Sequence, residues 1–388
     1  MAINSKTKTV ILIAVTVPET FLSILKLQPR FLNGEFEVVL VCSPGANVLD
    51  IGENEGVAVN VVKMRRGISP FRDIVSIVGM VRCILRCKPE IVHSYTPKAG
   101  LIAMIAARLC FVPVRVHTFT GLIFPTAHGI KRELLIWIDR LICFCATRVI
   151  PEGNGVKNDL QRFRITHRPL QVIGHGNIAG VDTSYFSPNA IGLSKFAVEL
   201  KTQLGIDSDA FVFCFVGRLN KDKGIGELMQ AFAALPSNAH LLFVGELDQT
   251  APVGADVLAS IEAHPRVHML GFLVDVRPAL RVAHVLVLPS YREGFPNVVL
   301  QAGAVALPVI ATDINGCNEV IEPGFNGWLV PPRDAPALQC AMRDAMQTSA
   351  TKLQEMGSRG RERVQIRFEQ RGHWERMAQL YRGMLPAD

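Results

Sequence analysis

Short apolar runs alternate with longer helical patterns along almost the whole chain. In the first half, the apolar runs cover residues 9–15, 37–42, 90–93, 115–118, 148–151 and 170–173. Several of the segments between them are long enough for crossover helices, namely 71–87, 97–110 and 130–146. Strands joined by crossover helices form parallel sheets with helices on both faces. The pattern therefore predicts an α/β fold with a doubly wound parallel sheet.

The same alternation occurs a second time after a turn-rich interruption from Gly174 to Gly180. The later apolar runs cover residues 211–216, 241–244, 267–269, 285–288 and 309–311. A chain of 388 residues also exceeds what one hydrophobic core usually serves. We therefore expect two Rossmann-like domains, 1–188 and 189–364, followed by a helical segment, 365–388, that packs back on the first domain.

Positive charge is concentrated in the first half of the chain. Residues 1–190 contain 22 Lys and Arg against 13 Asp and Glu, although the formal net charge of the whole chain is only +7. This asymmetry favours an anionic partner for the first domain, such as nucleic acid, an anionic membrane surface or a phosphorylated lipid. An ordinary solvated basic surface is the alternative.

The cysteines and the hydropathy pattern indicate a cytoplasmic protein. The nine cysteines are an odd number, and none has the spacing of a metal-binding Cys-x-x-Cys pair. The apolar run after Lys6 and Lys8 lacks a small-residue cleavage site and fits a buried first strand. Charged residues interrupt every apolar stretch of about 18 residues, so we expect no membrane-spanning helix. Such a chain is still able to lie on a membrane surface.

The first candidate site follows the apolar run 211–216. In open parallel sheets, ligands bind beyond the carboxyl ends of the strands. The segment from Gly217 to Gly224, with the sequence GRLNKDKG, supplies a turn glycine, the guanidinium of Arg218 and the ammonium of Lys223 near a helix start. These groups suit a diphosphate. A charged loop without a ligand is the alternative.

The second candidate site follows the apolar run 285–288 and has the sequence PSYREGFPNVVLQ. Pro296, near a helix start, leaves the backbone donors of the first turn able to meet an anion. Glu293 would lie within reach of sugar hydroxyls, and Gln301 would lie one helical turn beyond Asn297. An ordinary surface carboxylate is the alternative for Glu293.

Together, these two segments resemble the nucleotide-sugar site of family 4 of the retaining GT-B glycosyltransferases. The resemblance covers nearly the whole chain and includes Thr312-Asp313 with Gly316, Asn326-Gly327, and Gly176 with Val181-Asp182. In the first half, residues 96–100 (TPKAG) and 117–121 (HTFTG) resemble members that build bacterial capsular and O-antigen polysaccharides on lipid carriers. The resemblance implies a GT-B fold, in which two Rossmann-like domains face each other across a cleft.

The resemblance also implies a role for each motif residue. Arg218 and Lys223 hold the donor diphosphate and stabilise the leaving nucleotide, and Glu293 contacts the donor sugar. His117, in the acceptor-binding first domain, lies beside the transferred sugar and the acceptor. The family retains the anomeric configuration without an enzyme nucleophile, so catalysis rests on positioning and on neutralising the departing diphosphate.

Two sets of site residues follow. The donor set, in the nucleotide-sugar-binding second domain, is Gly217, Arg218, Lys223, Glu293, Gly294, Phe295, Pro296, Asn297 and Gln301. The set for the acceptor or the membrane is His93, Lys98, His128, Lys131 and Arg132. A structural, hydrogen-bonded histidine is the alternative for His93, and a solvated surface is the alternative for the basic residues. We expect no metal, because Asp207-Ser208-Asp209 precedes its strand, at the end of the sheet away from ligands.

The chain departs from the family pattern at Gln301, where the family usually has a second glutamate. That residue is expected to accept hydrogen bonds from the nucleotide ribose. An amide still accepts at its oxygen but loses the stronger charge-assisted bond. We therefore expect weaker or altered donor binding rather than inactivity. A second departure lies at residues 16–20, where TVPET replaces the glycine-rich loop of many members.

The predicted reaction is transfer of a hexose or N-acetylhexosamine from a UDP-linked donor to a polyprenyl-diphosphate-linked glycan at the inner face of the cytoplasmic membrane. No nucleic acid is expected as a partner. Because of Gln301, a degenerate transferase that serves as a nucleotide- or membrane-binding scaffold is an alternative. A nucleotide-sugar epimerase is another, although Arg218, Lys223 and Glu293 fit transfer better. No Gly-x-Gly-x-x-Gly follows the first strand, which argues against a nicotinamide dehydrogenase.

Overall fold

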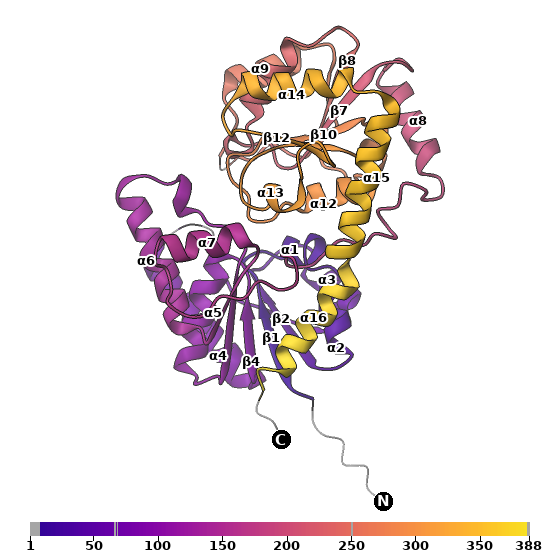
Figure 1. Cartoon of the computed structure of the whole chain (residues 1–388). Coiled ribbons are helices and arrows are strands. Elements are labelled where there is room, and N and C mark those ends of the chain that lie inside the picture. The colour runs from indigo at the N-terminus through magenta and orange to yellow at the C-terminus, as the bar shows by residue number, and fades with distance from the viewer. Residues whose placement is uncertain (1–7, 66, 68, 250, 386–388) are drawn as a thin grey trace, which may run out of the picture. The chain divides into compact units, whose positions relative to one another are not determined.

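The computed structural model describes residues 8–65, 67, 69–249 and 251–385. The chain forms two compact units. The first contains the residues up to Ala179 together with those from Arg371 onward, and the second is Gly180–Gln370. Each unit contains a six-stranded sheet in which every neighbouring pair of strands is parallel (Figure 1). The expected α/β class is confirmed.

The sheet of the first unit has the strand order β3-β2-β1-β4-β5-β6. Its strands are β1 (Val10–Ala14), β2 (Glu37–Cys42), β3 (Ala58–Val61), β4 (Ile91–Ser94), β5 (Val114–Phe119) and β6 (Arg148–Pro151). This is the Rossmann order, and the direction of progression reverses between β1 and β4. The expected Rossmann-like topology of the first half is therefore confirmed.

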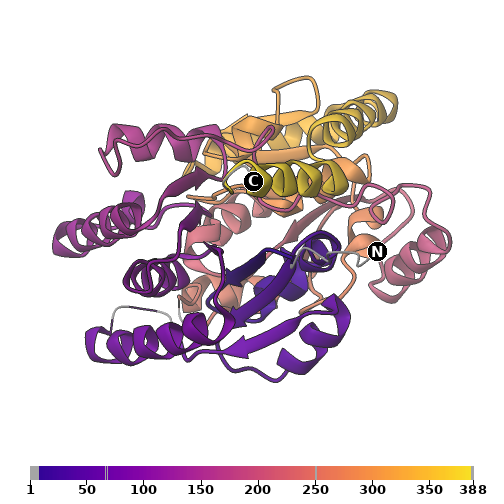
Figure 2. The ribbon, with the colours of Figure 1, turned by 90° about the horizontal axis from the view of Figure 1, so that it is seen from below.

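Helices cover both faces of the first sheet. They are α1 (Glu19–Ser23), α2 (Gln28–Asn33), α3 (Val48–Glu55), α4 (Pro70–Cys87), α5 (Pro97–Leu109), η1 (Phe124–Thr126), α6 (Gly129–Cys145), α7 (Asn154–Arg162) and α16 (Gln370–Arg382). Helices α4, α5 and α6 lie side by side and share one apolar core with the sheet (Figure 2). Helices α1, α2, α3 and α16 contribute to the core on the other face.

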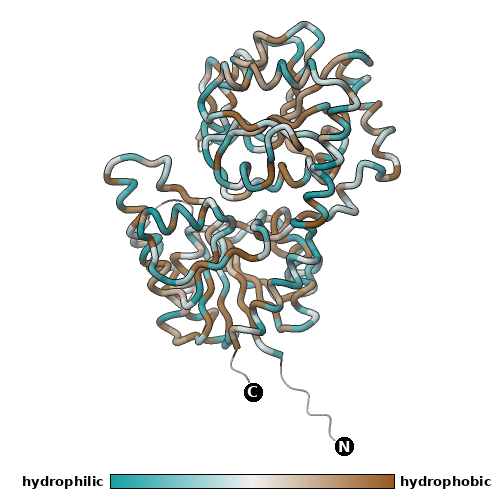
Figure 3. The backbone as a smooth tube through the Cα atoms, in the orientation of Figure 1, coloured by the Kyte–Doolittle hydropathy of each residue, from teal (hydrophilic) through white to brown (hydrophobic). Residues whose placement is uncertain are grey.

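The second sheet has the order β12-β11-β10-β7-β8-β9, which is the same topology. Its strands are β7 (Phe211–Val216), β8 (Ala239–Val244), β9 (Val267–Met269), β10 (Val285–Leu288), β11 (Val309–Thr312) and β12 (Gly327–Val330). Figure 3 shows hydrophobic strand segments in the middle of each unit. Because all four residues of β10 and β11 are buried, these strands read as continuous apolar runs.

Helices also surround the second sheet. They are α8 (Leu193–Gln203), η2 (Lys221–Lys223), α9 (Ile225–Ala233), α10 (Ala255–Ala263), α11 (Arg277–Val282), α12 (Asn297–Ala304), α13 (Cys317–Val320), α14 (Ala335–Gln347) and α15 (Ala350–Arg367). Helix α9 packs beside α14, and α12 packs beside α15. In the described part of the chain, no helix combines the length and apolarity needed to cross a bilayer.

One expected strand is wrong, and two strands were not predicted. Residues 170–173 form no strand; they run outside the sheet and line a pocket with α16, while β6 remains the edge strand. Strand β3 is short and half exposed, and β12 begins with a glycine, so neither has a marked apolar pattern. Both segments become strands because β3 pairs with β2 and β12 pairs with β11.

The chain passes between the units at positions that differ from the expected boundaries. It enters the second unit between Ala179 and Gly180, rather than after residue 188. There the backbone N–H of Val181 donates to the carbonyl of Phe368 at 2.9 Å, and that of Gln370 donates to the carbonyl of Val181 at 3.1 Å. This pairing ends α15 and starts α16, so the helix expected from 365 onward is divided. Helix α16 packs on the first unit, as expected.

Candidate active site

The candidate site lies where the strand progression of the second sheet reverses. Strands β7 and β10 are neighbours there, although they are far apart in sequence. The loops 217–224 and 289–296 follow their carboxyl ends. This switch point is where ligands bind in sheets of this topology. The structure therefore brings the two predicted motifs together at one edge of the sheet.

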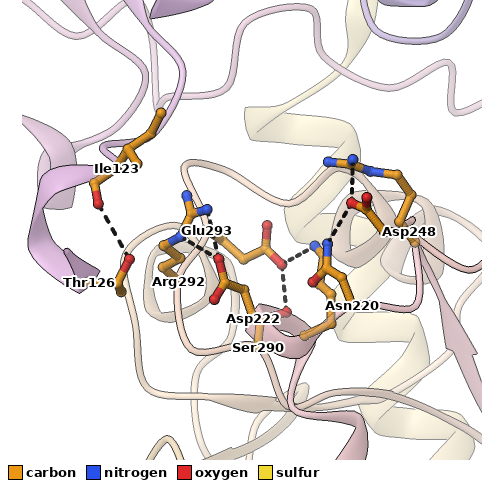
Figure 4. Close-up of polar contacts among 10 residues, drawn as sticks. Ile123, Thr126, Asn220, Asp222, Asp248, Ser290, Arg292 and Glu293 are labelled. Atoms are coloured by element: carbon orange, nitrogen blue, oxygen red, sulfur yellow. Dashed lines mark hydrogen bonds and ion pairs between the residues drawn. The ribbon is translucent and has the colours of Figure 1, made fainter. Parts of the chain in front are cut away.

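An ion pair joins the two loops. Nζ of Lys223 lies 2.5 Å from Oε1 of Glu293, and both side chains are mostly buried. The hydroxyl of Ser290 donates to the same carboxylate oxygen at 2.6 Å (Figure 4). The Thr312 hydroxyl in turn donates to the backbone carbonyl of Ser290 at 2.5 Å. Glu293 is thus fixed by one cation and one hydroxyl, which orients its carboxylate at the edge of the sheet.

A second ion pair holds Arg218. Its Nη1 donates to Oδ2 of Asp248 at 2.8 Å, and Nδ2 of Asn220 donates to the same oxygen at 3.3 Å. The Asp248 side chain is 7% exposed, whereas that of Arg218 is 59% exposed. A buried carboxylate therefore anchors a guanidinium that reaches into solvent. Figure 4 shows Asn220 and Asp248 on the side of Ser290 away from Arg292.

Further polar contacts hold the loop after β10 against η2. The backbone N–H of Tyr291 donates to the carbonyl of Asp222 at 2.8 Å, and Nε of Arg292 donates to the Asp222 carboxylate at 2.9 Å. The Tyr291 hydroxyl donates to the carboxylate of Glu227 at 2.7 Å. These contacts fix the relative position of Lys223 and Glu293, because they tie the loop after β10 to η2 and to α9, the helix that follows Lys223.

Helix α12 begins directly after the second loop. Pro296 is its N-cap residue, and Asn297 and Gln301 occupy its first and second turns. The Phe295 side chain is buried in the core, with its ring centroid 5.4 Å from that of Phe368. Of Phe295, only the backbone is therefore available to a ligand. The prediction that the Phe295 side chain contacts the donor is therefore wrong.

The charges of the site suit a ligand that has both an anionic group and hydroxyl groups. Lys223 and Arg218 provide two cations, and the Glu293 carboxylate accepts hydrogen bonds. Burial, and then the nearby Glu293 carboxylate, raises the pKa of the Cys317 thiol well above its usual value. This thiol therefore stays protonated and is a poor nucleophile. The arrangement is equipped to bind and neutralise a diphosphate.

His117 lies on β5 of the first unit and is only 1% exposed. Its Nδ1 lies 2.9 Å from the hydroxyl of Ser94, and a Cβ on Gly100 would lie 2.4 Å from its ring. Glycine at position 100 is therefore what allows the imidazole to pack against α5. Burial lowers the pKa of His117 to about 3, so the ring is neutral at physiological pH.

Models of two protein families match the chain. Residues 28–176 match the glycosyl transferase 4-like domain, and residues 210–348 match the glycosyl transferases group 1. The capsular polysaccharide biosynthesis glycosyltransferase CapM of Staphylococcus aureus is 30% identical over 375 residues, which are 96% of each chain. The chain belongs to this glycosyltransferase family. The expected family membership and enzyme class are confirmed.

A second relative agrees with this assignment, and a solved structure shares the fold. A UDP-Gal:alpha-D-GlcNAc-diphosphoundecaprenol alpha-1,3-galactosyltransferase of Escherichia coli is 28% identical over 309 residues, which are 78% of each chain. The sucrose-phosphate synthase of Thermosynechococcus elongatus has a similar structure, with a TM-score of 0.81 and 22% identity, over 97% of this chain and 99% of that one. The latter likeness concerns the fold alone.

In this glycosyltransferase, His93 is a core residue. It is fully buried, with Nδ1 2.6 Å from the Tyr381 hydroxyl and Nε2 2.7 Å from the Thr118 hydroxyl. Both ring nitrogens are therefore engaged by the protein, and Tyr381 belongs to α16. The prediction of an acceptor or membrane contact for His93 is wrong, because the imidazole has neither an exposed edge nor an open nitrogen.

The predicted basic residues divide into two kinds. Nζ of Lys98 lies 2.8 Å from both carboxylate oxygens of Asp73, and this largely buried pair joins α5 to α4. Lys98 is therefore a structural cation, and its prediction as a contact residue is corrected. His128 and Lys131 are exposed at the start of α6. Arg132 is partly exposed and pairs with Glu133 at 2.9 Å.

The sequence did not single out Asp248, Ser290 and Asp222 as site residues. Ser290 and Asp222 lie within the quoted motifs. Ser290 donates to Glu293 of its own loop, whereas Asp222 receives Arg292 from the other loop. Asp248 follows β8, so the rule that selects residues after a strand also applies to it. Its contact with Arg218 spans 30 positions in the sequence, and only the pairing of β7 with β8 brings them together.

Proposed function

We propose that this glycosyltransferase moves a hexose or N-acetylhexosamine from a UDP-linked sugar to a polyprenyl-diphosphate-linked glycan, with retention, in the synthesis of a cell-surface polysaccharide. The second unit would bind the nucleotide sugar, and the first would bind the acceptor. The observation that carries the proposal is the pair of cations at one switch point, Arg218 and Lys223, beside the Glu293 carboxylate.

The donor diphosphate would lie between these cations. Arg218 offers a planar set of donors to phosphate oxygens, and Lys223 adds a point charge. As the bond to the sugar breaks, negative charge grows on the departing diphosphate, and both cations would stabilise it. The Glu293 carboxylate, oriented by Lys223 and Ser290, would accept hydrogen bonds from donor sugar hydroxyls. This chemistry needs no metal ion and no enzyme nucleophile.

His117 would act in this reaction as a neutral imidazole. With its low pKa, it is not a proton donor at physiological pH. Its Nδ1 is engaged by Ser94, so Nε2 is the atom that would serve a substrate. We propose that it contacts the sugar or the acceptor through this nitrogen.

A lipid-linked acceptor fits the surface of α6. Ile130, Leu134, Trp137, Leu141 and Phe144 are all exposed, with Ile130 at 89% and Trp137 at 64%. We name this set the apolar stripe of α6. Its spacing places the five side chains on one helix face.

Cations lie along this apolar stripe. The guanidinium of Arg108 lies 4.2 Å from the ring centroid of Phe144, and that of Arg140 lies 5.5 Å from the ring of Trp137. Lys131 is exposed one residue after Ile130. An exposed apolar face flanked by Lys and Arg is typical of helices that lie in the interface of an anionic membrane. We propose peripheral attachment of the first unit through this face.

The test is a transfer assay with purified protein. UDP-, GDP- and ADP-linked sugars are first screened by thermal shift, because a ligand that binds only the folded state raises the melting temperature. A donor that stabilises the protein is then incubated with polyprenyl-diphosphate-linked glycans in detergent micelles. We expect one UDP-sugar to stabilise the protein and to transfer its sugar, with the anomeric configuration of the donor in the product.

Two results would contradict the proposal. Binding of a UDP-sugar without transfer to any lipid-linked glycan, and without donor hydrolysis, would favour the scaffold function. Stabilisation by a GDP- or ADP-sugar alone, with transfer, would leave the reaction class intact and overturn the donor assignment.

A further inference from the structure

The loop after β8 is joined to the loop that carries Arg218. The backbone N–H of Leu219 donates to the carbonyl of Glu246 at 2.8 Å, and that of Asp248 donates to the carbonyl of Leu219 at 3.0 Å. Gly245 has φ +137°, and a Cβ there would lie 2.0 Å from the carbonyl oxygen of Gly217. The two loops are therefore in direct backbone contact, which places the Asp248 side chain beside Arg218.

The Asp248 carboxylate contacts one edge of the guanidinium. Its Oδ2 receives Nη1 of Arg218 at 2.8 Å. Among the residues that the structure describes, Nε and Nη2 of Arg218 make no hydrogen bond. Since the carboxylate is buried and the guanidinium is exposed, the pair points the remaining N–H groups outward. An arginine held in this way keeps donors for a second anion.

We propose that Asp248 is a positioning residue that orients Arg218 for the donor diphosphate. This inference rests on the proposed function, in which Arg218 binds that diphosphate. An exposed arginine samples many rotamers, and ordering it costs entropy at the moment of binding. The ion pair with Asp248 restricts the guanidinium beforehand, so donor binding orders fewer torsions. The benefit is largest where charge develops, that is, in the transition state.

A purely structural role for the Asp248 side chain gives a different expectation. The backbone bonds between the two loops do not involve the carboxylate. Asp248→Asn keeps the shape and the backbone pairing, but it removes the charge that holds the guanidinium. If the carboxylate only stabilised the loop, its loss would affect activity to the same degree whether or not Arg218 is present.

The experiment is a double-mutant cycle of Asp248→Asn and Arg218→Ala in the full chain. We measure kcat, KM for the UDP-sugar and the melting temperature of each variant. Asp248→Asn should lower kcat/KM about 10-fold in the natural background, mostly through kcat, and less than about twofold in the Arg218→Ala background. Asp209→Asn, an exposed carboxylate of the same unit, is the matched control and should have no effect.

The outcomes separate the two proposals. The positioning role would be overturned if Asp248→Asn lowered kcat/KM by the same factor in both backgrounds. It would also be overturned if this variant were as active as the natural protein or more active. Full activity of Arg218→Ala would instead overturn the proposed donor site. If Asp248→Asn does not fold, Asn220→Ala removes the amide that contacts the same carboxylate oxygen. Asn220→Ala should lower kcat/KM by less than is expected for Asp248→Asn, and the decrease should again require Arg218. The same decrease in the Arg218→Ala background would count against the proposal.

Discussion

Lys223 and Glu293 are 70 positions apart in the sequence, yet Nζ of the lysine lies 2.5 Å from Oε1 of the glutamate. The contact exists because β7 and β10 are neighbours in the second sheet. It gives the site a cation and a carboxylate that orient each other.

Removal of either cation should strongly reduce turnover. We expect Arg218→Ala and Lys223→Ala each to lower kcat on the order of 100-fold or more, because each loses stabilisation of the departing diphosphate. Steady-state kinetics with the donor identified by thermal shift measure the effect. Lys221→Ala, an exposed lysine of the same segment, is the control and should retain activity. Unchanged kinetics of Arg218→Ala or Lys223→Ala would remove that residue from the mechanism.

The amide at position 301 should be replaceable by a carboxylate. Gln301→Glu is expected to preserve or tighten nucleotide binding, because a carboxylate accepts a stronger, charge-assisted hydrogen bond from the ribose. Isothermal titration of UDP gives the dissociation constant. Gln365→Glu, an exposed position on α15, controls for the added negative charge. A large loss of affinity for Gln301→Glu alone would show that the amide has a function of its own.

The apolar stripe of α6 should govern attachment to membranes. Trp137→Glu places a charge in the middle of the stripe, so vesicle binding should fall about tenfold or more. Co-sedimentation with phosphatidylglycerol-containing vesicles and with pure phosphatidylcholine vesicles measures it, with stronger binding expected to the anionic ones. Ile366→Glu changes an equally exposed apolar residue of α15 in the second unit and should have no effect. Equal binding of both variants would refute the assignment of α6.

Asp139 should make stability depend on pH. Burial raises its pKa to about 7, against about 3.9 in an unfolded chain. The folded state therefore holds this proton more tightly, and the resulting stability is fully present below about pH 3.9 and is lost as pH rises from there through about 7. Asp139→Asn mimics the protonated form in both states, so it should raise the free energy of unfolding by on the order of 4 kcal/mol at pH 8 but only by about 1.5 kcal/mol at pH 5, where the folded protein keeps its proton.

Urea titrations at pH 5 and pH 8 measure this difference. The buried His117 and His373 have lowered pKa values and act in the opposite direction, since stability is lost as pH falls below about 6.5. They are present in both proteins and cancel when the variant is compared with the natural chain. The same stability difference at both pH values would mean that Asp139 does not titrate in this range.

Local pattern was sufficient for most of the fold. Buried parallel strands such as β10 are continuous apolar runs, and their short length distinguishes them from the longer helices between them. The same pattern failed at residues 170–173, which are mostly apolar but pair with no strand and instead line a pocket with β6 and α16. It also failed at β3, whose half-exposed residues carry little signal. Strand pairing, which the local pattern does not contain, decides both cases.

The sequence by itself determined the two Rossmann-like sheets and the loops in which Arg218, Lys223 and Glu293 lie, because apolar periodicity and the position of a residue after a strand are local properties. Only the tertiary structure decided which side chains meet. Asp248 anchors Arg218 across 30 positions, and Tyr381 engages His93 across 288. Such contacts depend on the order of strands in each sheet and on the packing of α16 on the first unit. The same residue types would therefore have different partners in another topology.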